Sequence, residues 1–582
     1  MSGIFEIKDT FYLNGKPFQI LSGSIHYFRI VPEYWRDRLE KLKNMGLNTV
    51  ETYIPWNVHE PGKGEFVFEG MADIVGFVKL AQELGLYVIL RPSPYICAEW
   101  EFGGLPAWLL KEDNLYVRSS APEFLEHVKQ YYQVLLPRLK PLQITEGGNV
   151  ILMQIENEYG HFSDDTAYME AIRDLLLEGG ITVPLITSDD PREESIKSGS
   201  VEGALVTGNF GSRTRERFEI LKKFTNGGPL MCAEFWVGWF DHWGNGGHMK
   251  GDLERSAIDL DDMLKLGHVN IYMFIGGTNF GFMNGSNYYE NLTPDVTSYD
   301  YDAVLSEAGD LTPKYWRYRE IISKYKEIPQ MELSAPVQKR SYGKVSVKEK
   351  VGLMESLDLL SVAQESTYPR SMERLGQNYG YILYTSPVRN EQKLERIRLW
   401  KANDRVNLFV DNQRLLNLYD HDLSMEHELS VDVTNNRELR ILVENMGRVN
   451  FGPRMNDQRK GIDGCVQING HMHTNWKQYP LPFDNLDKLD FTKGYTEGMP
   501  AFYRFDLEVD EAGDTFLELE GWGKGCVFIN GFNIGRFWEI GPQKRLYIPA
   551  PLLRTGHNEV IVFETEGKTG ENIAFCGEPD IG

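Results

Sequence analysis

Residues 149–160 read NVILMQIENEYG, an apolar run of strand length that ends in two glutamates separated by an asparagine. Short apolar runs bounded by turn signals are typical of buried strands. Seven further runs of this kind follow one another between residues 17 and 277: PFQILSGS (17–24), NTVETY (48–53), YVILRPS (87–93), VPLITS (183–188), ALVTGNF (204–210), PLMCAEF (229–235) and NIYMFIGG (270–277). The sequence therefore predicts eight strands in this region.

Longer helical patterns separate these runs: EYWRDRLEKLKNMG (33–46), ADIVGFVKLAQELG (72–85) and DDTAYMEAIRDLLLEGG (164–180). The second has apolar residues at three-to-four spacing and a terminal glycine, which predicts an amphipathic helix with a C-cap. Eight such repeats over roughly 260 residues predict an α/β protein with a (β/α)8 TIM barrel. The alternative is an open doubly wound sheet, which would need a glycine-rich phosphate motif after the first strand. The chain has SGSIHYFR there instead.

Beyond about residue 330 the pattern changes to alternating apolar and polar residues with Asn-Gly or Asp-Asn turns, a pattern typical of β-sandwich and jelly-roll domains. Examples are RVNLFVDNQRL (405–415), RELRILVEN (437–445), DTFLELEGW (514–522) and GCVFINGFNIGRFW (525–538). We expect three domains: a TIM barrel over 1–330, a first β-sandwich over 331–490, and a second β-sandwich over 491–582.

Composition excludes several classes of function. The 582 residues carry a formal net charge of −23, which disfavours nucleic-acid and anionic-membrane partners. The five cysteines are scattered without a metal-ligand spacing, and no HExxH motif occurs, so neither a metal nor another cofactor is expected. The chain shows no secretory leader and no run of 18 apolar residues, so a cytoplasmic location is expected.

Catalytic residues of a TIM barrel lie where its strands end. The fourth predicted strand ends in Glu156, Asn157 and Glu158, and the seventh ends in Glu234. Carboxylates after these two strands would flank one bond from opposite sides of the barrel mouth, as glycoside hydrolysis requires. Glu156 and Glu158 compete for the acid role, and position alone favours Glu158 only slightly. Asn157 would hydrogen-bond a sugar 2-hydroxyl.

Several ordered blocks resemble one known family. They are SGSIHYFR, NTVETYIPWNVHEP, LRPSPYICAEWEFGGLPAWLL, QIENEYG, AEFWVGWFDHWG, NIYMFIGGTNFGFMNG and TSYDYDAVLSEAGD, spread over residues 22–310, together with GWGKGCVFINGFNIGRFW near the C-terminus. In these blocks the chain resembles glycoside hydrolase family 35, the acid-type β-galactosidases, and in particular intracellular bacterial enzymes for short oligosaccharides. The resemblance implies a retaining, metal-free enzyme that removes terminal non-reducing β-D-galactose from a small-molecule galactoside. It also implies that the barrel over 1–330 is the catalytic domain and that the last sandwich, 491–582, is galactose-binding-like.

Residue roles follow from the same resemblance. Glu158 of ENEYG would be the acid/base and Glu234 of AEFW the nucleophile. The residues that would bind the sugar are Tyr53, Cys97, Ala98, Glu99, Asn157, Tyr272 and Tyr301. A buried salt bridge to Arg91 is the alternative reading of Glu99, and core packing is the alternative reading of the last two tyrosines.

One departure from the family pattern concerns the second sugar. Many members have tyrosine two residues after the nucleophile, where this chain has Trp236, followed by Trp239. We expect the two tryptophans to form a stacking wall that favours β-1,3 linkages. Two other functions stay open from the sequence: an exo-β-glucosaminidase on the same scaffold, and a non-catalytic carbohydrate-binding protein. A homodimer is a further expectation.

Overall fold

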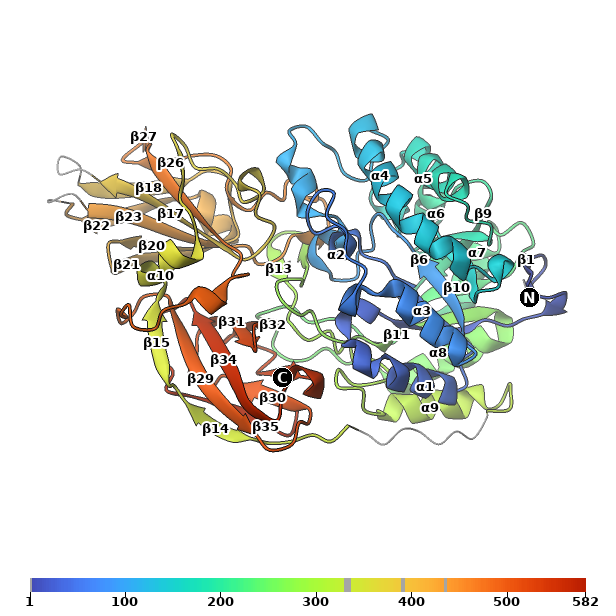
Figure 1. Cartoon of the computed structure of the whole chain (residues 1–582). Helices are drawn as coiled ribbons and strands as arrows, with labels where there is room; N and C mark the ends of the chain where they lie inside the picture. Colours follow the sequence, from blue (N-terminus) through green and yellow to red (C-terminus); the bar gives the residue numbers. More distant parts are fainter. Residues whose placement is uncertain (1–2, 329–336, 389–392, 434–436) are drawn as a thin grey trace.

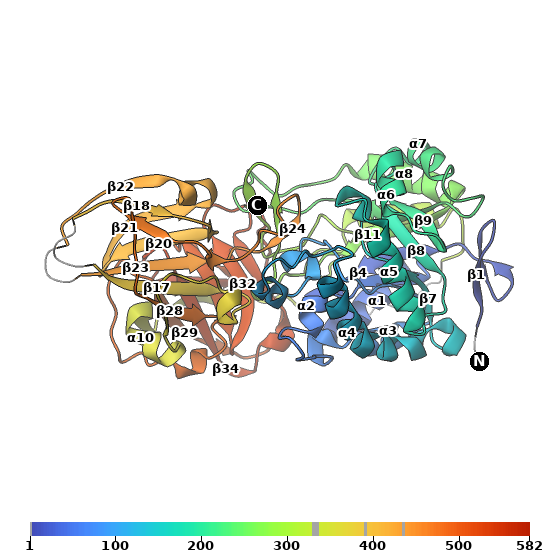
Figure 2. The same cartoon turned by 90° about the horizontal axis from the view of Figure 1, so that it is seen from above.

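The computed structural model describes residues 3–328, 337–388, 393–433 and 437–582. The N-terminal half forms a barrel with helices around it, on the right in Figures 1 and 2, and the β-rich C-terminal half lies against one side of it. Before the barrel, the chain forms a small hairpin of β1 (Phe5–Ile7), β2 (Phe11–Leu13) and β3 (Lys16–Pro17).

Eight parallel strands close the barrel in the order β10-β11-β4-β5-β6-β7-β8-β9. Each of the eight predicted runs supplies one of them: β4 (Leu21–Ile25), β5 (Thr49–Tyr53), β6 (Tyr87–Arg91), β7 (Val150–Gln154), β8 (Leu185–Asp189), β9 (Ala204–Asn209), β10 (Met231–Trp236) and β11 (His268–Ile275). Almost every residue of these strands is buried, because both the interior of the barrel and its helix-covered outside are packed. The predicted TIM barrel is confirmed.

Helices cover the outside of the barrel (Figure 1). They are α1 (Trp35–Asn44), α3 (Ile74–Glu83), α4 (Pro122–Leu139), α5 (Thr166–Glu178), α6 (Glu193–Gly199), α7 (Thr214–Leu221), α8 (Leu253–Leu266) and α9 (Pro313–Ile322), and a short α2 (Trp56–His59) follows β5. The Asp73 side chain caps α3 by accepting from the Gly76 amide. Gly85, just beyond the end of α3, has a φ of +73°, the left-handed conformation that a glycine cap provides.

The middle unit is a β-sandwich of two antiparallel sheets. One has the strand order β16-β28-β17-β23-β20-β21 and the other β22-β18-β26-β27. Their side chains enclose a separate apolar core that includes Ile382, Val406 and Ile441. The strands are β16 (Gln364–Ser366), β17 (Tyr381–Val388), β18 (Leu394–Leu399), β20 (Arg405–Val410), β21 (Gln413–Tyr419), β22 (Glu426–Val431), β23 (Arg437–Glu444), β26 (Val466–Ile468), β27 (His471–Met472) and β28 (Trp476–Leu481).

The last unit is a second sandwich, with sheets β15-β29-β34-β31-β32 and β14-β35-β30-β33. Its strands β14 (Gly343–Ser346) and β15 (Glu349–Gly352) precede the whole middle sandwich in the sequence, and helix α10 (Leu353–Leu360) follows them. The other strands are β29 (Ala501–Val509), β30 (Thr515–Glu518), β31 (Lys524–Ile529), β32 (Phe532–Trp538), β33 (Arg545–Ile548), β34 (Gly556–Glu564) and β35 (Asn572–Cys576). The boundaries at 330 and 490 stay predictions, and these pairings group 343–352 with the last unit.

A small sheet joins the barrel to the middle sandwich. In it β12 (Ser286–Tyr288), from a loop after β11, pairs with β13 (Leu292–Pro294) and, in parallel, with β24 (Val449–Phe451) of the middle unit. Val449 is part of the barrel's apolar core. Within the described ranges, no helix has the length and apolar character needed to cross a membrane.

Candidate active site

A cavity of about 450 Å³ opens where the barrel strands end. Every site residue expected from the sequence lines it: Tyr53, Cys97, Ala98, Glu99, Asn157, Glu158, Glu234, Trp236, Trp239, Tyr272 and Tyr301. They lie on β5, β10 and β11 and in the loops that follow β6, β7, β10 and β11. The rule that strand ends carry the site therefore brings residues together that are up to about 250 positions apart.

Three hydrogen-bond donors hold the carboxylate of Glu234. Tyr53 donates its hydroxyl to Oε1, and Arg91 Nη1 lies 2.6 Å from the same oxygen. The indole N–H of Trp236 donates to the other oxygen, Oε2, over 3.0 Å. Donors to both oxygens favour the ionised form of a carboxyl group. Glu234 is therefore built to carry a negative charge.

Arg91 lies between two carboxylates beneath the cavity floor. Its Nε is 2.9 Å from Glu51 Oε1, its Nη1 reaches Glu234, and its Nη2 donates to the Ala233 carbonyl over 2.6 Å. Burial raises the pKa of Glu51, and the charge of Arg91 opposes this rise. The ion pair between Glu99 and Arg91 that the sequence left open is not formed, because Arg91 is engaged by Glu51 and Glu234.

Glu158 has a different environment. Its Oε1 accepts one hydrogen bond, from Asn209 Nδ2 over 3.0 Å. Burial, and after it the nearby negative charge of Glu234, raise the pKa of Glu158 to about 8. A carboxyl group with this pKa keeps its proton at neutral pH and can act as a general acid.

Glu156 is engaged elsewhere. Arg118 holds it with a two-pronged ion pair, Nε to Oε1 and Nη2 to Oε2, both 2.8 Å, and Tyr168 donates to Oε1 over 3.0 Å. Glu156 is 1% exposed and does not line the cavity. Of the two competing glutamates after β7, only Glu158 faces the site.

Comparison with known proteins fits this geometry. Residues 10–325 match the profile described as "Glycosyl hydrolases family 35". The chain belongs to glycosyl hydrolase family 35. Within it, residues 369–482 match "Beta-galactosidase, first all-beta domain", and residues 500–558 match "Beta-galactosidase, galactose-binding domain". The chain is therefore a glycoside hydrolase.

Curated relatives match this family 35 chain along nearly all of its length. It is 41% identical over 591 residues to the human "Beta-galactosidase-1-like protein 2", covering 98% of this chain and 91% of the relative. It is 40% identical to the "Beta-galactosidase" of Mus musculus, with 96% and 91% covered. It is also 40% identical to the "Beta-galactosidase" of Xanthomonas manihotis, with 92% and 90% covered.

The buried end of the family 35 cavity offers groups suited to sugar hydroxyls. Glu99 accepts from the Tyr299 hydroxyl, and burial raises the pKa of Glu99 to about 7. Oδ1 of Asn157 already accepts from the Gln154 amide over 3.0 Å and lies 2.8 Å from the Tyr53 hydroxyl oxygen, which leaves the Asn157 amide nitrogen for a ligand. In the described ranges no group of three or more His, Cys, Asp or Glu side chains is arranged to hold a metal ion.

Aromatic rings form the open rim of the cavity. Trp239 is 40% exposed and contacts the edge of Trp236, with ring centroids 5.6 Å apart. Tyr289, 68% exposed, and Phe451 of the middle sandwich lie 6.2 Å apart and complete the rim. The two tryptophans therefore have different roles: Trp236 donates a hydrogen bond to Glu234, and Trp239 does not.

Sequence reasoning missed several residues of the site, among them Asn209, Tyr299, Tyr289 and Phe451. Asn209 ends β9, and the strand-end rule would have found it if applied to the sixth strand. Tyr299 lies two residues before the predicted Tyr301, and no pattern separates the two. Phe451 comes from another domain, about 130 residues beyond the end of α9, and no local signal in the sequence connects it to the site.

Proposed function

We propose that this family 35 enzyme is a retaining exo-β-galactosidase that cuts terminal β-D-galactose from short oligosaccharides. The observation that carries the proposal is the contrast between two carboxyl groups at one cavity. Glu158 has a pKa raised to about 8, whereas Glu234 receives three hydrogen-bond donors. An acid that keeps its proton, beside a second carboxyl group fixed by hydrogen-bond donors on both oxygens, is what acid-assisted displacement at a sugar requires.

In the first step, Glu234 attacks the anomeric carbon of galactose from the face opposite the glycosidic bond. Glu158 gives its proton to the leaving oxygen, so the rest of the oligosaccharide departs as a neutral alcohol. A covalent α-galactosyl ester on Glu234 results. Tyr53, Arg91 and Trp236 lose part of their interaction with the carboxylate as its charge is consumed.

In the second step, Glu158, now ionised, takes a proton from water. The hydroxide so formed attacks the anomeric carbon, breaks the ester to Glu234 and releases β-galactose. Glu158 is again protonated and Glu234 again ionised, so the enzyme returns to its starting state. Asn157 supports both steps, because its free amide nitrogen can bind the sugar 2-hydroxyl, where hydrogen bonds strengthen in the transition state.

The anomeric form of trapped products tests the two roles. With an activated aryl galactoside and azide, Glu234→Ala should give α-galactosyl azide, because azide enters from the face that the missing carboxylate leaves open. Glu158→Ala should give β-galactosyl azide, because azide replaces the missing base on the intermediate. The same azide anomer from both variants, or no rescue of either, would refute the assignment.

Substrate choice is tested separately. The wild-type chain should hydrolyse nitrophenyl β-galactoside, and NMR should show β-galactose before it mutarotates. Faster cleavage of nitrophenyl β-glucosaminide would identify the chain as an exo-β-glucosaminidase instead. If neither substrate is cleaved, the non-catalytic carbohydrate-binding function would be favoured. On a galactosyl disaccharide, whose poor leaving group needs the proton, Glu158→Gln and Glu234→Gln should each lower the rate by several orders of magnitude.

A β-1,3 preference is proposed from the tryptophans at the rim. Trp239→Ala tests it better than Trp236→Ala, because Trp236 also donates to Glu234. The wild type should cleave β-1,3-galactosyl disaccharides faster than β-1,4 and β-1,6 ones, and Trp239→Ala should narrow these differences. Trp316→Ala, at an exposed tryptophan of α9, is the control. Equal wild-type rates on the three linkages, or an unchanged ranking in Trp239→Ala, would refute the preference.

A further inference from the structure

The middle sandwich contributes one segment to the cavity, residues 445–451, which leads from the end of β23 to the end of β24. Its last residue, Phe451, lies at the rim. An exo-acting enzyme holds the terminal sugar at the buried end of its cavity, so the rim receives the sugar attached to it. The following inference rests on the proposed function, because it concerns this second sugar.

The barrel holds one side of the 445–451 segment. Ser286 Oγ donates to the Gly447 carbonyl over 2.9 Å, and the Tyr95 hydroxyl donates to the Asn450 carbonyl over 2.5 Å. Gly447 has a φ of +117°, and a Cβ atom there would lie 2.5 Å from the Asn284 carbonyl oxygen. The segment therefore lies against the barrel in a close fit that only glycine permits at this position.

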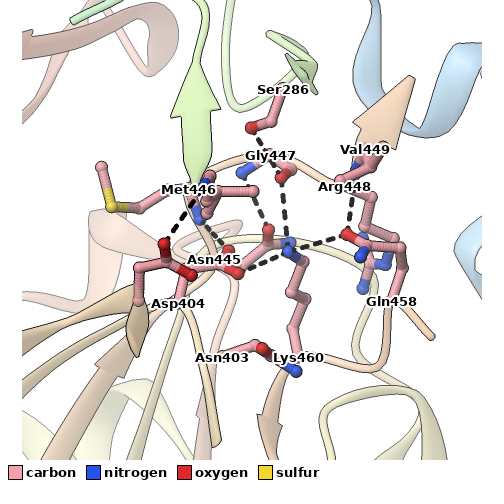
Figure 3. A network of polar contacts seen from close by, with 12 residues as sticks. Ser286, Asn403, Asp404, Asn445, Met446, Gly447, Arg448, Val449, Gln458 and Lys460 are labelled. Atoms are coloured by element: carbon pink, nitrogen blue, oxygen red, sulfur yellow. Dashed lines mark hydrogen bonds and ion pairs between the residues drawn. The ribbon is translucent and has the colours of Figure 1, made fainter. Parts of the chain in front are cut away.

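A buried lysine holds the other side. Lys460, 1% exposed, lies at the centre of the network in Figure 3. Its ammonium nitrogen is 2.6 Å from Asp404 Oδ1, 3.2 Å from Gln458 Oε1 and 3.3 Å from the Gly447 carbonyl oxygen. The two side-chain partners in turn accept from the backbone of the segment. Asp404 Oδ2 accepts from the Met446 amide over 2.8 Å, and Gln458 Oε1 accepts from the Val449 amide over 2.9 Å.

One charged group thus fixes three points of a short segment, at residues 446, 447 and 449. Burying an ammonium group is costly unless it is paired and fully hydrogen-bonded, and here the partners are those that orient the segment. None of Lys460, Asp404 and Gln458 lines the cavity. They act on it only through the backbone that leads to Phe451.

We propose that Lys460 is a specificity-determining positioning residue: through Asp404 and Gln458 it holds the 445–451 segment so that the Phe451 ring contacts the second sugar. The middle sandwich therefore selects the leaving part of the substrate, although the lysine never touches it. Losing Lys460 should weaken cleavage of substrates that fill the rim and spare those that do not.

Two substrates separate this effect from catalysis. β-Galactosyl fluoride has a leaving group too small to reach the rim, whereas a β-1,3-galactosyl disaccharide fills it. Lys460→Met should lower kcat/KM for the disaccharide roughly tenfold, as expected for one lost ring contact. The fluoride value should stay within about twofold of the wild type, since the carboxylates are untouched. Phe451→Ala should show the same pattern, and the double variant should be no worse than Phe451→Ala alone.

Lys41→Met is the matched control. Lys41 is also buried and also holds an aspartate and a backbone carbonyl, with Nζ 2.7 Å from Asp37 Oδ2 and 2.9 Å from the Gly309 oxygen, but it lies on α1 outside the site. This variant should be less stable than the wild type, but the ratio of its kcat/KM on the disaccharide to its kcat/KM on galactosyl fluoride should be unchanged. If Lys460→Met does not fold, Gln458→Met should lower the disaccharide-to-fluoride ratio of kcat/KM less, because it removes the link to the Val449 amide and one partner of Lys460 but keeps Asp404 and its bond to the Met446 amide.

Equal losses on both substrates in Lys460→Met, or losses that add up in the double variant, would overturn the inference. An inert wild type on galactosyl fluoride would instead refute the proposed function, so the two failures are distinguishable.

Discussion

The hydrogen bond from Asn209 to Glu158 should set how far toward alkaline pH the enzyme works. The Asn209 amide donates to Glu158 over 3.0 Å, which favours the ionised carboxylate and opposes the effect of burial. Glu158 must hold its proton to act as the acid, so kcat/KM falls as the pH rises through the pKa of about 8. Removing the donor raises this pKa further. The alkaline limb of the pH profile should therefore move to higher pH in Asn209→Leu.

The size of the shift follows from the strength of the bond. A hydrogen bond to a charged group contributes about 1.5 kcal/mol at the low end of its range, and about 1.4 kcal/mol corresponds to one pKa unit. The limb should thus move up by about one unit. The assay is kcat/KM for a galactosyl disaccharide, because its poor leaving group needs the proton. Asn209→Asp should shift the limb further, because it adds a negative charge beside Glu158.

Thr207→Val serves as the control for disturbance of β9. Thr207 lies on the same strand and donates to the Thr187 carbonyl over 2.7 Å, away from the carboxylates. The Thr207→Val substitution should leave the alkaline limb of the pH profile at the same pH as in the wild type. An alkaline limb that stays in place or moves to lower pH in Asn209→Leu would refute both the role of Asn209 and the assignment of the limb to Glu158.

Three further substitutions have distinct expected outcomes. Glu156→Gln leaves the buried charge of Arg118 without its partner, and denaturant unfolding should show a loss of about 3–5 kcal/mol with kcat retained by the folded fraction. Trp236→Phe keeps the ring but removes the N–H to Glu234, so kcat/KM for galactosyl fluoride should fall roughly tenfold, and an unchanged value would contradict the role of that bond. The pKa of Glu99 is raised from 4.5 to about 7, so the wild type loses stability as the pH rises between these values; unfolding midpoints of Glu99→Gln should show a smaller loss.

Much of the barrel could be read from the sequence because its strands are buried on both faces. Each of the eight apolar runs became a barrel strand, and the end of a run marked the mouth of the barrel. The same rule led to Glu158 and Glu234. Their catalytic roles, the cytoplasmic location and the homodimer remain predictions.

The features of the site that could not be predicted depend on contacts between distant parts of the chain, and the periodicity of the sequence does not encode these contacts. The competition between Glu156 and Glu158 is decided by Arg118, about 40 residues earlier in the sequence. Phe451 reaches the cavity because β24 pairs with β12, which lies more than 160 residues before it. Neither partner could be identified without the three-dimensional arrangement.

The order of the strands also constrains how the protein is made. Strands β14 and β15 pair with β35 and β29, so the last sandwich is encoded in two parts, and the middle one is inserted between them. During synthesis the barrel leaves the ribosome first. Its cavity lacks part of the rim until residue 451 has also been synthesised. Strands β14 and β15 stay unpaired for longer, because their partners β35 and β29 lie nearer the C-terminus. Truncation from that end would thus leave β14 and β15 without their partners, and the full activity of nascent chains on disaccharides, which fill the rim, should appear only near completion of synthesis.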